Sequence, residues 1–133
     1  PMIAAYIAAL VVMLVVDLIW LGVVAKPLYQ QGIGHLMAPK PMLSAAAIFY
    51  AIYPVGLVFF AIAPDGVVPS WSSVVAKGAL FGLFAYATYE LTNLAMLRGW
   101  PLKIVLIDIA WGAALSALCA AAGKWAWGLA ASG

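Results

Sequence analysis

The sequence predicts an all-α integral membrane protein, with four transmembrane helices packed as an antiparallel bundle. One reason is composition: of 133 residues, 68% are hydrophobic and only 8% are charged, whereas about a quarter are charged in a soluble domain. The other is the presence of four apolar runs, each long enough for the roughly 20 residues that cross a hydrocarbon core. We therefore expect a single transmembrane domain over 1–133.

The first run covers about 3–24, and the second covers about 42–63 and ends before Pro64. We do not expect the first to be a cleaved signal peptide, because no basic segment precedes it and its apolar run is too long. The segment between the two runs is typical of a loop, since it contains several prolines and glycines. Four of its residues predict a short helix lying on the membrane surface: Leu28, Tyr29, Leu36 and Met37.

The third run covers about 74–97 and is closed by Arg98, Gly99 and Trp100. The fourth covers about 101–123, and a proline at its start suits the first turn of a helix. Beyond this run, a basic residue and two tryptophans are typical of an interfacial anchor: Lys124, Trp125 and Trp127.

Basic residues predict the orientation of the helices. Four of them flank the first and third connections: Lys26, Lys40, Arg98 and Lys103. Only Lys77 and Lys124 flank the opposite side, together with Asp65. Because positively charged loops stay in the cytoplasm, we expect both termini and the second connection to lie outside it.

Three acids lie inside the predicted spans: Asp17, Glu90 and Asp108. At about 1.5 Å per residue, they lie roughly 21, 24 and 21 Å from the outer side. An acid facing lipid costs on the order of 3 kcal/mol or more, so each acid should point into the bundle. The third helix supports this, because one stripe at spacings of three and four holds Gly78, Gly82, Tyr86, Glu90, Asn93 and Leu97. Its glycines allow close helix packing, and Asn93 can hydrogen-bond across a helix contact.

Aromatic residues accompany the acids. Trp20 follows Asp17 by three positions and Trp111 follows Asp108 by three, which places each tryptophan on the face of its aspartate. Four tyrosines occur in pairs three apart: Tyr50, Tyr53, Tyr86 and Tyr89. Two interpretations of the tyrosines stay open. They pack in the core with hydroxyls bonded to the acids, or they line a polar cavity.

The segments "DLIWLG", "FYAIYPVGL", "GALFGLFAYATYELTNLAML" and "DIAWG", in this order and spacing, resemble an uncharacterised bacterial membrane family, domain of unknown function 2177 (DUF2177). The resemblance covers nearly the whole chain, and its segment "YATYELTNLA" is specific. It implies a four-helix protein of the bacterial inner membrane, without an established reaction. In the family pattern an aspartate is usual at the position of Glu90. This chain therefore keeps a carboxyl group there, on a longer side chain.

Several kinds of site are not expected. The net charge of +2 is small and its basic residues are scattered, which does not suggest nucleic-acid binding. Cys119 is the single cysteine and His35 the single histidine, so neither an internal disulfide nor a soft-metal site is expected. No nucleotide-binding motif or hydrolase triad is present. We expect no cofactor and no metal. Binding of a hard cation stays open, because Asn93, Thr92 and the tyrosines could supply oxygen ligands beside the three carboxylates.

Three functional interpretations remain. The cluster binds or transports a small lipid-like or proton-linked molecule, because neighbouring carboxylates in low dielectric are not all ionised and suit proton handling. Alternatively, the chain is a structural subunit of a larger membrane complex, or a membrane enzyme that modifies lipid, although no catalytic residue is identified. The lipid bilayer is the expected partner, and a membrane-protein partner or a homo-oligomer stays open.

Overall fold

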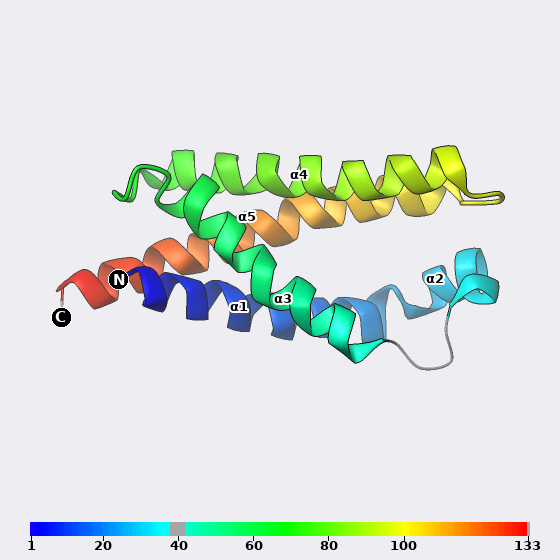
Figure 1. Ribbon diagram of the computed structural model, residues 1–133, viewed down its shortest axis with the longest axis horizontal. Coiled ribbons are helices and arrows are strands. Elements are labelled where there is room, and N and C mark those ends of the chain that lie inside the picture. The colour runs from blue at the N-terminus through cyan, green and yellow to red at the C-terminus, as the bar shows by residue number, and fades with distance from the viewer. Residues whose placement is uncertain (38–41, 133) are drawn as a thin grey trace.

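The computed structural model describes residues 1–37 and 42–132. Within them the regular structure is helical, and the long helices alternate in direction along the chain, as Figure 1 shows. The α-helices of the described residues are α1 (Met2–Ile19), α2 (Lys26–Ile33), α3 (Leu43–Leu57), α4 (Trp71–Met96) and α5 (Leu102–Ser132). The N-terminal end of α1 and the C-terminal end of α5 lie at one end of the molecule, and α2 and the α4–α5 turn lie at the other.

Two of these helices continue in a π-helical turn, in which backbone hydrogen bonds span five residues instead of four. In α1 the turn is Trp20–Val24, and the Ala25 N–H donates to the Trp20 carbonyl over 2.7 Å. In α3 the turn is Val58–Ile62, and it follows Pro54, which lies inside the helix. The turn that follows α2, Gly34–Leu36, is a 3₁₀ turn.

Three of the described helical segments are long and apolar enough to cross a membrane: Met2–Val24, Leu43–Ile62 and Leu102–Ser132. The third predicted span, about 74–97, corresponds to α4, which has 26 residues but is not among them. Serines, threonines and Lys77 lower its hydropathy, together with Glu90 and Asn93. Length alone would permit a crossing, since about 20 helical residues suffice.

The helix bounds differ from the predicted spans mainly at two places. α4 begins at Trp71 because Ser70 caps it, accepting a hydrogen bond from the Ser73 N–H over 3.4 Å. α5 continues beyond Gly123 to Ser132. Its Lys124 Nζ reaches the Pro69 carbonyl over 2.6 Å and lies over the Trp71 ring, which ties the end of α5 to the start of α4.

Small residues bring α4 and α5 into close contact. A Cβ atom at Gly82 would collide with the Gly112 carbonyl, and one at Gly112 would collide with the Tyr86 ring. Gly78 similarly lies against Ala120 and the Ser116 carbonyl. This is the small-residue packing that the glycine stripe predicts.

α1 packs on the other side of α5 through a stripe of buried residues four apart, which are Ala5, Ala9, Met13 and Asp17. α3 is placed differently. It crosses the bundle obliquely, as Figure 1 shows, and meets α4 chiefly through the turn Val58–Ile62. The N-terminal half of α3 therefore diverges from α4.

Candidate functional site

A cavity of about 600 Å³ lies where α3 diverges from α4. Its walls come from every helix, and most of them are apolar or aromatic. All three predicted acids line it. The lining residues are Asp17, Leu21, Tyr29, Ile33, Ala46, Phe49, Tyr50, Tyr53, Ala85, Tyr86, Tyr89, Glu90, Trp100, Ile104 and Asp108.

Asp17 is held from both sides of its carboxyl group. Tyr50 of α3 donates its hydroxyl to Oδ2 over 2.5 Å, and Trp111 of α5 donates its indole N–H to Oδ1 over 3.1 Å. The residue is only 6% exposed. Two neutral donors therefore compensate for the loss of water around this buried acid.

Asp108 is reached from the short helix α2. The Tyr29 hydroxyl donates to Oδ1 over 2.9 Å, and it accepts in turn from the Trp20 indole over 3.4 Å. The Trp20 and Trp111 rings stack, with centroids 4.2 Å apart and planes within 7°. Each tryptophan thus serves the aspartate of the opposite helix, Trp111 directly and Trp20 through Tyr29.

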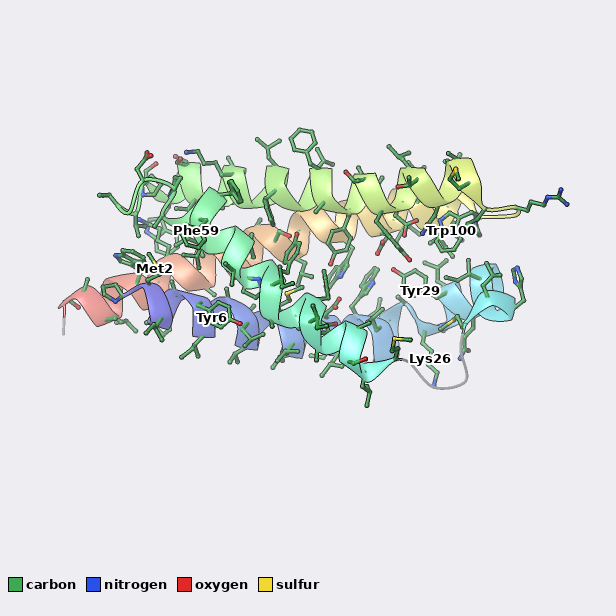
Figure 2. The ribbon with its side chains drawn as sticks, viewed as in Figure 1. Met2, Tyr6, Lys26, Tyr29, Phe59 and Trp100 are labelled. Carbon is green, nitrogen blue, oxygen red and sulfur yellow. The ribbon has the colours of Figure 1, made fainter. Side chains whose placement is uncertain are left out.

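Glu90 is the most deeply buried of the acids, at 2% exposure. Trp100 donates its indole N–H to Oε2 over 2.8 Å. The turn that makes this contact needs Gly99, whose φ of 70° lies in the left-handed region. Because the chain reverses there, Trp100 lies beside the last turns of α4. Figure 2 shows Trp100 and Tyr29 at the same end of the molecule, on either side of the space between α4 and α2.

Tyr29 lies outside the long helices, and its ionisation is disfavoured. Burial raises the pKa of its hydroxyl above the ordinary value, and the negative charge of Asp108 acts in the same direction. The group therefore remains a neutral hydrogen-bond donor to Asp108 through the physiological range.

Most of the predicted site residues meet in the cavity. Seven line it, namely Asp17, Tyr50, Tyr53, Tyr86, Tyr89, Glu90 and Asp108. Trp20 and Trp111 are not in its wall but act on the acids through hydrogen bonds. Asn93 lines an adjoining pocket of about 530 Å³ with Arg98, and that pocket shares Tyr89 and Trp100 with the cavity.

All four tyrosines of the pattern line the cavity, and their hydroxyls have different partners. Tyr50 bonds an acid, whereas Tyr53 exchanges a hydrogen bond of 2.6 Å with the buried Ser116. Tyr89 packs edge-on against Trp100. Thr92, considered as an oxygen ligand, is exposed and bonds to the Thr88 carbonyl of its own helix.

Sequence reasoning missed three partners of the site: Tyr29, Trp100 and Ser116. Tyr29 was expected at the membrane surface, but its hydroxyl points inward to Asp108. The sequence pattern indicates Trp100 only as part of the turn that ends the third predicted helix. A chemical argument could have found Tyr29 and Trp100, because each buried acid needs hydrogen-bond donors. Both residues carry an aromatic ring with a donor group, and both lie in the connections between the predicted spans.

Among residues 1–37 and 42–132, no group of three or more His, Cys, Asp or Glu side chains is placed to hold a metal ion. His35 is exposed in the turn after α2. The oxygens of Asp17 already accept hydrogen bonds from two donors.

A family model described as a predicted membrane protein, DUF2177, matches residues 2–125. The chain belongs to the DUF2177 family. No curated protein and no solved structure matches it. As a DUF2177 member it is a membrane protein, and the resemblance seen in its acid and aromatic segments is confirmed.

Proposed function

We propose that this DUF2177 protein binds a small amphipathic molecule in the cavity between α1, α3, α4 and α5, and that binding or transport is linked to protonation of the acids. One observation carries the proposal. Carboxyl groups from three helices line a cavity of about 600 Å³, whose volume falls in the range of small-molecule sites. A purely structural polar cluster would be expected to fill such a space with side chains.

The proposal includes four membrane crossings, with α4 as the third. α4 turns its buried face, Gly78, Gly82 and Glu90, toward its neighbours. Large apolar residues, including Leu80, Phe84 and Leu91, are exposed on its outer side. A helix with this distribution suits lipid on one face and protein on the other. We place the chain in the bacterial inner membrane, as the family resemblance implies. We place both termini outside the cytoplasm, because the basic residues gather at the first and third connections.

Hydrogen bonds around the acids support a site that is already formed before a ligand arrives. Asp17, Glu90 and Asp108 each accept from at least one Trp or Tyr donor. These donors hold the carboxyl groups in place at the cavity wall, and pre-organisation of this kind lowers the cost of binding.

Native mass spectrometry of gently solubilised protein tests the proposal. We expect the wild-type protein to retain a small amphipathic molecule. The triple variant Asp17→Asn, Glu90→Gln, Asp108→Asn should lose that molecule while remaining folded. Asp65→Asn is the matched control, because Asp65 is the one remaining acid and is exposed in the connection before α4. A stoichiometric protein partner with an empty cavity would instead favour a structural subunit.

A further inference from the structure

We infer that the ligand of this cavity is a lipophilic organic cation that carries a single positive charge and exchanges with a proton. This inference rests on the proposed binding function and adds the chemical class of the ligand. It starts from two separate observations, the charge that surrounds the cavity and the apolar character of its walls and rim.

The charge of the cavity is unbalanced. Asp17, Glu90 and Asp108 line it, and none of the described lining residues is Lys, Arg or His. The other titratable side chains that face it are tyrosines of α2, α3 and α4. Arg98 lies in the adjoining pocket, beyond Trp100. In a low-dielectric site, carboxylates without a cationic partner must be neutralised by protons or by a bound cation.

Trp and Tyr donors already contact the carboxyl oxygens of the acids. The site therefore favours a cation that does not need those oxygens as direct ligands. Tyr50 and Trp111 occupy both oxygens of Asp17, and Tyr29 and Trp100 occupy one oxygen each of Asp108 and Glu90. A hard metal ion requires several oxygens at short distance at once. An organic ammonium or phosphonium ion needs only a nearby negative charge, and it gains further stabilisation from aromatic faces.

The rim of the cavity indicates a hydrophobic ligand. Leu21, Phe49 and Tyr89 line the cavity and are also 42%, 41% and 56% exposed. The cavity therefore reaches the outer surface of the bundle past apolar and aromatic side chains. A small hydrated ion would lose its water at such an opening at high cost, whereas a cation with apolar groups would not.

Binding of one cation releases one proton, so the charge within the cavity is conserved. The proton leaves a carboxyl group of the cavity and passes to the solvent, and the cation takes its place beside the resulting carboxylate. Protons and cations then compete for the same acids. Raising the pH should tighten cation binding, by up to about tenfold per pH unit for one proton.

Equilibrium binding of radiolabelled tetraphenylphosphonium to the detergent-purified protein tests the inference, with tetraphenylborate as an anion of the same shape. We expect saturable binding of the cation that tightens with pH and releases protons into a weakly buffered solution. The triple variant Asp17→Asn, Glu90→Gln, Asp108→Asn should bind it at least about tenfold more weakly, and Asp65→Asn should bind it as the wild type does.

Two results would overturn the inference. If the protein binds tetraphenylborate as well as tetraphenylphosphonium, and the triple variant loses neither, the cavity does not select a cation. The proposed function would then stand whenever mass spectrometry still finds a ligand that depends on the acids. If neither probe binds and no ligand is retained, the inference and the proposed function both fail.

Discussion

Trp100 donates its indole N–H to the carboxyl group of Glu90 over 2.8 Å, although the two residues lie on opposite sides of the α4–α5 turn. This contact ties the most buried acid of the chain to the turn that reverses its direction. Trp100→Phe should therefore lower the free energy of unfolding by about 1–3 kcal/mol, because the buried carboxyl loses its donor. Trp125→Phe is the control, since Trp125 is 61% exposed. Equal thermal midpoints of both variants in detergent would argue against the contact.

Glu90→Gln should leave the thermal midpoint unchanged or higher. A glutamine amide keeps an oxygen for the Trp100 N–H and removes an ionisable group whose charged form is costly to bury. Ligand retention, in contrast, should be lost, because an amide cannot exchange a proton. Thermal melts and mass spectrometry on the same sample separate these two effects. Full retention by the amide variant would reduce Glu90 to a hydrogen-bonding role.

Asp17→Asn should also be tolerated structurally, for a reason specific to its two donors. Trp111 can only donate, so the asparagine oxygen must face the indole. The Tyr50 hydroxyl can accept as well as donate, so the asparagine NH₂ group can face Tyr50. Adding Tyr50→Phe removes that acceptor and should lower the thermal midpoint less than Tyr50→Phe does alone in the wild type, where the buried carboxyl group loses a donor. A simple sum of the two effects would contradict this geometry.

Gly82→Ala should destabilise the protein by about 1–3 kcal/mol or more. The added methyl group would collide with the Gly112 carbonyl, and a backbone atom cannot move aside as a side chain can. Gly128→Ala is the matched control, because it lies in α5 with nothing within 4 Å of the added carbon. Its helix should gain up to about 1 kcal/mol from the higher helix propensity of alanine. Thermal unfolding of the two variants in parallel checks the prediction.

Cysteine labelling in intact cells tests the orientation. A cysteine at Val67 should react with an impermeant thiol reagent added outside, and a cysteine at Gln30 should not. Both positions are exposed. The native Cys119 is fully buried and gives no background. The reverse labelling pattern would place α2 and the acid cavity nearer the outer side.

An alkaline titration tests the environment of Tyr29. Free tyrosine ionises near pH 10, and the pKa of Tyr29 is raised above this value. The folded protein therefore keeps a proton that the unfolded chain loses, and stability should fall as the pH rises above about 10. Tyr29→Phe should lessen this fall. A variant whose pH dependence matches the wild type would contradict the buried position of the hydroxyl.

The common depth and shared faces of the acids predicted their meeting, because helix geometry fixes where Asp17, Glu90 and Asp108 lie along the bundle. Helix geometry also places Gly78 and Gly82 on one face of α4, and this predicted the close contact of α4 with α5. Tyr29 and Trp100 could not be placed in this way. Tyr29 lies 79 positions from Asp108, and the positions of both side chains depend on how the connections fold back.

Asn93 shows the limit of reasoning from faces alone. It shares the stripe of Glu90, three positions further along the helix, and was expected in the same site. The structure places it in the adjoining pocket, which borders the cavity at Tyr89 and Trp100. A helical stripe indicates which side of a helix faces inward, but it does not show where a neighbouring loop closes one space off from the next.

For the proposed ligand, the oblique course of α3 would separate the recognition of charge from the recognition of shape. The acids stand on α1, α4 and α5, whose small residues lock them together. α3 is joined to α1 and α5 by hydrogen bonds of the Tyr6, Tyr50 and Tyr53 hydroxyls, whereas α4 and α5 are in close backbone contact at their glycines. Under the proposed function, a bulkier ligand would displace α3 while the spacing of the acids stays constant. On that proposal, the protein would accept a series of compounds that share a positive charge and differ in shape.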